Sequence, residues 1–147
     1  MKRVTLICLI AIIALLSFGC GNGDEKKEVS QKDLVMHYSS LNSRYFEVID
    51  FYDALGEKTI SKFNWRIISD SSKKSSQRTI DALKNSDSPI APKLIAIAED
   101  VIAFTEELDG AVDKGKTPDM SYKPKIKAAL EELEPEMTKM KNEILKQ

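Results

Sequence analysis

The sequence has little histidine and none of the short motifs that organise common metal or catalytic sites. Its single histidine, His37, lies four residues after Asp33, a spacing that puts both side chains on one face of a helix. Two ligands do not complete a metal site, and no Glu-x-x-His, Cys-x-x-Cys-His or Gly-x-Ser-x-Gly motif occurs. We therefore expect no metal, no cofactor and no catalytic residues, and a protein that is not an enzyme.

The charge of the sequence has no strong excess of either sign. Twenty-two basic and 23 acidic side chains give a formal net charge of −1, and the two kinds are well mixed. Proteins that bind nucleic acid usually carry a basic patch, so this balance argues against a nucleic-acid partner. Acidic pairs such as Glu106–Glu107 and Glu131–Glu132 alternate with lysines, which is typical of solvated helix faces.

Long apolar runs are absent except at the N-terminus. Lys2 and Arg3 precede fifteen uncharged, apolar or small residues, from Val4 to Phe18. A helix that spans a bilayer needs about 20 such residues, so this run is short for a span. A basic start, a short apolar stretch and a small residue after it indicate a secretory signal peptide. The alternative is a retained anchor with a single span.

Cysteine is scarce as well, because Cys8 lies within the apolar run and only Cys20 follows it, in the segment LSFGC. This segment resembles the lipobox of bacterial lipoproteins, in residues 1–20 only, with Gly19 before the cut and Cys20 after it. The resemblance implies a lipidated (palmitate-bearing) Cys20 and a mature protein without a free thiol. It also implies a protein at the cell membrane or outer membrane that faces the periplasm or the exterior. Gly21 replaces the Asp linked to inner-membrane retention, which favours the outer membrane in a Gram-negative host.

On this interpretation the chain has three parts. Residues 1–19 form the signal peptide, residues 20–29 hold the lipidated cysteine and a flexible Gly-rich and charged tether, and residues 30–147 form a single domain. Three segments of this domain carry apolar residues at alternating steps of four and three, the period of packed helices. Their inward positions are Leu34, Tyr38, Leu41, Tyr45, Val48, Tyr52 and Leu55; Ile90, Leu94, Ile97, Val101, Phe104, Leu108 and Ala111; and Ile126, Leu130, Leu133, Met137, Met140 and Ile144.

The ends of these helices have recognisable signals. Ser30 begins a capping pattern for the first helix, and Gly56 is expected to end it. Ser88 is expected to cap the second long stripe, with Pro89 at its first helical position. Pro135 lies inside the last stripe and should bend that helix toward solvent or split it.

The segment from 59 to 85 is less clear, because residues 69–79 contain no apolar side chain. It is either a polar loop between two short helices or one helix that turns Ser72, Ser75 and Thr79 inward. The length of its neighbours favours the continuous helix, since antiparallel partners should match. Short connections and the absence of alternating strand patterns then predict an all-α, antiparallel up-down bundle of about four helices.

Tyr38, Tyr45 and Tyr52 lie seven residues apart within the first stripe. If the first two helices are antiparallel, residues whose numbers sum to about 115 lie level, which places Tyr45 beside Asp70–Ser72 and Tyr38 beside Ser76–Arg78. Large rings opposite small hydroxyls would fill the core and make internal hydrogen bonds. The alternative is a polar cavity in the middle of the bundle that binds a small ligand, with a candidate layer of Tyr38, Tyr45, Tyr52, Ser72 and Ser75.

A second apolar stripe, formed by Ala91, Ile95, Ala98 and Ile102, lies beside the inward positions of its helix. A central place in the bundle explains it, and a face for a protein partner is the functional alternative. The sequence therefore favours a membrane-anchored, non-enzymatic lipoprotein that binds a protein partner. A helical bundle that binds a small ligand or a metal through the Tyr/Ser layer is the second hypothesis.

Overall fold

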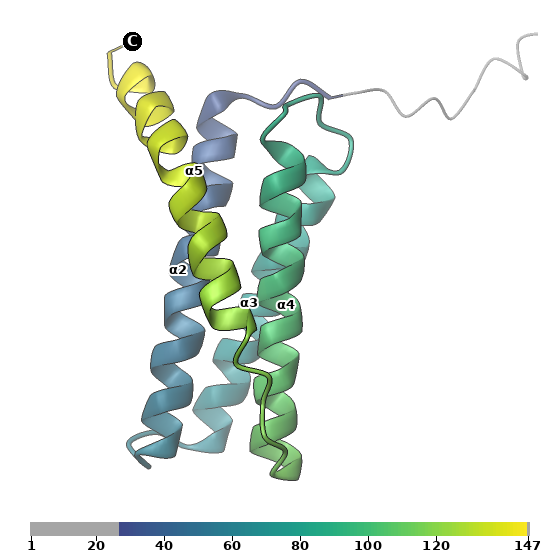
Figure 1. Ribbon diagram of the computed structural model, residues 1–147, viewed down its shortest axis with the longest axis vertical. Helices are drawn as coiled ribbons and strands as arrows, with labels where there is room; N and C mark the ends of the chain where they lie inside the picture. Colours follow the sequence, from purple (N-terminus) through teal and green to yellow (C-terminus); the bar gives the residue numbers. More distant parts are fainter. Residues whose placement is uncertain (1–26, 147) are drawn as a thin grey trace, which may run out of the picture.

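The computed structural model describes residues 27–146. The signal peptide, Cys20 and most of the expected tether lie outside these residues. Four helices follow one another: α2 (Gln31–Gly56), α3 (Lys62–Leu83), α4 (Ala91–Lys114) and α5 (Tyr122–Ile144). They run alternately up and down (Figure 1), which confirms the predicted all-α antiparallel bundle. None of these four helices is both long and apolar enough to cross a bilayer.

The bundle has two ends, which we call the tether end and the far end. The tether end holds the start of α2 and the loop 84–90, and the far end holds the loop 57–61 and the end of α4 (Figure 1). Helices α3 and α5 share no contacts and lie on opposite sides of α2 and α4, which touch each other. Helix α4 therefore packs against all three other helices.

The apolar stripes predicted from the sequence form the core. Its fully buried members from these stripes are Leu34, Leu41, Tyr45, Val48, Ile90, Leu94, Ile97, Val101, Phe104, Leu108, Ile126, Leu130, Leu133 and Met137. Tyr38, Tyr52 and Leu55 are half-buried and pack against the edge of this core. The inward positions are thus confirmed for these members, and burial of their apolar surface is the main force that holds the helices together.

Helix α3 is continuous, which confirms the second interpretation of its polar stretch. Its buried polar side chains are Ser69, Ser72, Ser76 and Thr79. Ser76 takes the inward position predicted for Ser75, whose half-buried hydroxyl instead lies 2.9 Å from that of Ser40 on α2. Small side chains let two helix backbones approach closely. Of all the helix pairs in the bundle, α3 and α4 have the most extensive contact.

Two of these buried hydroxyls, those of Ser72 and Ser76, have no hydrogen-bond partner. A buried hydroxyl without a partner destabilises the folded state, and alanine also has the higher helix propensity. We expect Ser72→Ala and Ser76→Ala each to raise the free energy of unfolding by about 0.5–1.5 kcal/mol in urea titrations. Ser69→Ala is the matched control and should lower it, because Ser69 donates to Asp109 over 2.8 Å. A loss of stability in all three variants would contradict this interpretation.

The ends of α2 match the sequence only in part. Ser30 caps the start as predicted, with its hydroxyl accepting the backbone N–H of Asp33 over 3.1 Å. The predicted end at Gly56 is confirmed, but the glycine is not the left-handed residue of the turn, which is Lys58, with φ of 59°. The backbone N–H of Thr59 bonds the carbonyl of Ala54 over 2.9 Å and closes this turn. The residues that follow the glycine, and not the glycine itself, thus supply the left-handed conformation and the hydrogen bonds that close this helix.

The start of α4 also differs from the prediction. Helix α4 begins at Ala91 and not at Pro89, and Pro92 lies in its first turn. Ser88 caps the preceding turn instead, because its hydroxyl accepts the N–H of Ile90 over 3.3 Å. The predicted end is confirmed, since Gly115 adopts a left-handed conformation with φ of 65°.

Helix α5 is not split by its proline. Pro135 lies inside the single helix Tyr122–Ile144 on its exposed side, where the carbonyl that loses its bond can reach water. The end of this helix leans away from α3 and α4 (Figure 1).

The last residues of the expected tether, from Lys27 to Val29, lie against the bundle. The backbone N–H of Lys27 bonds the carbonyl of Asn85 over 2.8 Å, and Val29 is half-buried against the core. These contacts hold residues 27–29 at the tether end of the bundle.

Candidate functional site

The register of α2 and α3 agrees with the sequence-based expectation. The hydroxyls of Ser40 and Ser75 lie 2.9 Å apart, and Nδ1 of His37 lies 3.1 Å from the hydroxyl of Thr79. In both pairs the residue numbers add to about 115, the value expected for this antiparallel pair.

The hydroxyls of the tyrosines nevertheless do not meet the serines of α3. Tyr38 donates to the carbonyl of Leu130 over 3.1 Å, and Tyr45 donates to the carbonyl of Lys123 over 2.9 Å. Both acceptors belong to α5, so the predicted pairing with serine is wrong. Burial, and secondarily a nearby glutamate, raises the pKa of both phenols.

The residues of the predicted ligand layer therefore do not converge on a shared cavity. Tyr38 and Tyr45 turn their hydroxyls toward α5, Ser72 is enclosed in the core, and Ser75 bonds to α2. Tyr52 lies apart from them at the far end, with its ring edge-on to Trp65 at a centroid distance of 5.7 Å. Sequence spacing placed the tyrosines on one stripe correctly but did not show which neighbouring helix they face.

The predicted partner face is not presented to solvent as a set. Ala91 and Ala98 are fully buried, while Ile95 and Ile102 are half-buried. The reason is the position of α4, which is enclosed by α2, α3 and α5. The structure thus supports the central-helix interpretation of this stripe and corrects its interpretation as an exposed surface.

His37 and Asp33 are not grouped with a third possible metal ligand among residues 27–146. Residues 27–146 contain no group of three or more His, Cys, Asp and Glu side chains that could hold a metal ion. His37 is half-buried, and burial lowers its pKa despite the opposing effect of Asp33.

This lowered pKa predicts a dependence of stability on pH. The folded protein binds the proton of His37 less readily than the unfolded chain, so this stabilisation is complete above the ordinary histidine pKa of about 6.5 and is lost as pH falls below it. We expect the midpoint of urea unfolding to fall with pH in this range, and to fall less in His37→Gln. Equal slopes for the two proteins would contradict the assignment to His37.

A groove at the far end combines apolar and charged side chains. Helix α5 starts level with the middle of α2, as the bond from Tyr45 to Lys123 shows. The loop 115–121 runs back along α4 before α5 begins, so the last turns of α2 and α4 have no α5 beside them (Figure 1). We call the resulting space the far groove.

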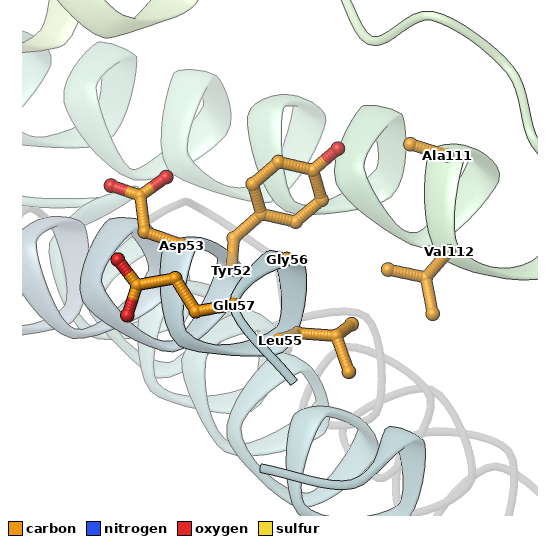
Figure 2. A pocket seen from close by; sticks show the side chains of 7 residues that line it. All are labelled: Tyr52, Asp53, Leu55, Gly56, Glu57, Ala111 and Val112. Carbon is orange, nitrogen blue, oxygen red and sulfur yellow. The ribbon is translucent and has the colours of Figure 1, made fainter. Parts of the chain in front are cut away.

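The far groove has a volume of about 490 Å³, within the range of small-ligand and anchor-residue sites. Its lining consists of Tyr52, Asp53, Leu55, Gly56, Glu57, Ala111 and Val112. Figure 2 shows the Tyr52 ring extended across it with the hydroxyl toward α4, the carboxylates of Asp53 and Glu57 together on one side, and Leu55 and Val112 on the other.

The carboxylates of the far groove are in an unfavourable electrostatic position. Asp53 lies in the last turn of α2 and Glu57 is the C-cap residue that follows the helix, four residues later, so their like charges repel each other. They also lie at the C-terminal end of α2, whose last turn contains no basic residue, and the helix dipole there favours positive charge. No ion pair joins either carboxylate to a basic side chain within residues 27–146, and the lining of the groove contains no basic residue.

A cluster of hydrogen bonds lies behind the Tyr52 wall of the groove. Trp65 is completely buried, touches Tyr52, and donates its Nε1–H to Asp109 over 2.9 Å. The same carboxylate accepts bonds from Ser69 over 2.8 Å and from Lys73 over 2.7 Å. Asp109 therefore ties the first half of α3 to α4 and fixes the position of the rings.

The far groove was not found from the sequence, although two of its signals are present there. Carboxylates stand at positions 53 and 57, just before a helix end where basic residues are usual. The heptad series of tyrosines also extends one step beyond the part of α2 that α5 covers.

No known protein family, no curated protein and no solved structure matches this chain. The geometry of the described residues therefore carries the functional argument.

Proposed function

We propose that this protein is a lipid-anchored, extracytoplasmic and non-enzymatic interaction module, and that the far groove is where it binds a protein partner. The observation that carries the proposal is the far groove itself, an opening with an apolar floor and unpaired carboxylates. The sequence offers no recognised catalytic set, which agrees with binding and not with chemistry.

The position of the far groove fits an anchored protein. The tether joins the bundle beside Asn85, at the opposite end from the groove. Helix α2 has 26 residues, and at 1.5 Å per residue it spans about 39 Å. If Cys20 carries lipid, the groove lies on the side that faces away from the membrane, where a partner can reach it.

Site-specific photo-cross-linking in intact cells tests the proposal. A photoreactive residue in place of Val112, which lines the groove, should give adducts with one or a few defined proteins. The same residue in place of Thr138, which is exposed on α5, is the matched control and should not give them.

The adducts should also depend on an open groove. Ala111→Arg places a long side chain in it and should remove the adducts formed from position 112, while the circular dichroism spectrum stays helical. Adducts that persist in this variant, or that form equally from position 138, would show that the partner binds elsewhere.

A further inference from the structure

We propose that the occupant of the far groove is a short, basic, amphipathic helical segment of the partner protein, which takes the place that α5 leaves empty. This inference rests on the proposed function and specifies the chemistry of the partner. Three observations support it: the series of tyrosines, the apolar floor and the unpaired charge.

The first observation is that the tyrosine series continues past the start of α5. Tyr38 and Tyr45 donate to carbonyls of Leu130 and Lys123, which lie seven residues apart on α5 as the two tyrosines do on α2. Tyr52 is the next member, but α5 begins at Tyr122 and offers no helix at its level. Its hydroxyl makes no hydrogen bond with another residue of 27–146 and points across the groove (Figure 2).

The expected contact follows from this repeat. A helical turn of a partner beside Tyr52 would present a backbone carbonyl to its hydroxyl, as α5 does for the other two tyrosines. This is the helix-in-groove mode of recognition, in which an amphipathic helix lays its apolar face on a hydrophobic surface.

The second observation is the apolar floor. Leu55, Val112 and Tyr52 are only half-buried. By contrast, Tyr45 and Val48, which lie seven residues before Tyr52 and Leu55, are fully buried. Toward the tether end, α5 packs against α2 and α4 and buries its own Ile126, Leu130 and Leu133. An aliphatic side chain of the partner would complete the core at the far end in the same way.

The third observation is the charge. Asp53 and Glu57 repel each other and the C-terminal end of α2, and no basic side chain of the described chain pairs with them. A lysine or arginine of the partner would relieve both repulsions at once. An acidic segment would add to them, and a neutral one would leave them unchanged, so the groove selects a basic occupant.

The sequence provides a reporter for binding. Trp65 is the only tryptophan of the chain and touches the ring of Tyr52 at 5.7 Å between centroids. A segment that contacts Tyr52 should therefore change the fluorescence of Trp65.

The test uses the purified full-length lipidated protein in nanodiscs of uncharged phosphatidylcholine. It is titrated with three designed helical peptides that contain no tryptophan and share one aliphatic stripe, with lysines, glutamates or glutamines on the other face. We expect saturable binding of the lysine peptide, weakening as salt is added. The glutamate and glutamine peptides should bind at least about tenfold less tightly.

Variants locate the binding. Asp53→Asn combined with Glu57→Gln should weaken binding of the lysine peptide about tenfold. Tyr52→Phe should also weaken this binding, because it removes the hydroxyl and keeps the ring. Asp81→Asn combined with Glu136→Gln neutralises two exposed carboxylates away from the groove and is the matched control, expected to bind as the natural protein does. Loss of like-charge repulsion should leave the Asp53/Glu57 variant at least as stable to urea, so weaker binding would not reflect unfolding.

Each other outcome overturns a defined part of the argument. Equal binding of all three peptides, still lost with Ala111→Arg, would refute the basic partner and leave the groove as a docking site. If free lysine or butylamine binds as tightly as the lysine peptide, the occupant is a small amine and not a helical segment. If no peptide binds and position 112 gives no adduct in cells, the proposed function fails together with this inference.

Discussion

Replacement of Trp65 by alanine is expected to lower the free energy of unfolding by about 3–5 kcal/mol, the largest loss of stability expected for a single residue here. Trp65 is completely buried, packs edge-on against Tyr52, and bonds Asp109. The alanine variant leaves a large cavity between α3 and the far end of the bundle and deprives Asp109 of one donor. Urea titration followed by circular dichroism at 222 nm measures the effect, because the tryptophan signal is lost with the residue.

Two further variants separate packing from hydrogen bonding. Trp65→Phe keeps a buried ring but removes the Nε1–H, so its loss of stability should fall between those of the natural protein and Trp65→Ala. Phe63→Ala is the matched control, because Phe63 is also aromatic and lies on α3 but is 71% exposed. It should change the free energy of unfolding by less than about 0.5 kcal/mol. Similar losses at positions 63 and 65 would contradict the burial described above.

Hydrophobic periodicity predicted most of the fold. Leu41, Val48, Leu94 and Leu133 all lie where the alternating steps of four and three place them, because a helix that buries one face must repeat its apolar residues at that period. The same reasoning applied to helix length predicted a continuous α3, although its inner face consists of hydroxyl-bearing residues. A polar face can be buried there because serine is small and α4 packs closely against it.

Helix ends were predicted less well, and the reason is local. Helix α4 begins two residues after the predicted Pro89, and α2 ends at Gly56 as predicted but without a left-handed glycine. The last carbonyls of a helix need hydrogen-bond partners, whichever residues supply them. At the end of α2 these partners are the N–H groups of Lys58 and Thr59, which lie beyond the glycine. Single-residue preferences of about 1 kcal/mol are easily outweighed by such a closed set of hydrogen bonds.

The candidate site could not be predicted because it depends on the path of a loop. The sequence shows that the connection from Gly115 to Ser121 is short, but not that it doubles back along α4 and moves α5 toward the tether end. That displacement decides which tyrosine finds a carbonyl. Because of this displacement, Tyr38 and Tyr45 donate hydrogen bonds to α5, whereas Tyr52 lines the far groove.

The far groove also combines two departures from what stability alone favours. An apolar floor is left half-covered, and two carboxylates stand at the end of α2 that favours positive charge. Natural sequences keep such local conflicts mainly where function requires them. Both conflicts disappear if a basic amphipathic segment binds, which is why a single occupant is proposed for them.

Replacement of Cys20 by alanine is expected to move the protein almost entirely from the membrane fraction to the soluble fraction, or to stop its maturation. None of the helices among residues 27–146 is long and apolar enough to cross a bilayer. On the proposed function, acyl chains on Cys20 would supply the attachment, at about 0.8 kcal/mol for each buried methylene. Cys8→Ala is the matched control, since Cys8 lies within the expected signal peptide and should leave fractionation unchanged. Mass spectrometry of the natural protein should find residues 1–19 missing and acyl chains on Cys20. Two results would contradict lipidation: a natural protein that keeps its first 19 residues, or a Cys20→Ala protein that stays in the membrane fraction. Either result would favour a retained membrane span at the N-terminus. The orientation of the far groove relative to the bilayer would then have to be determined anew.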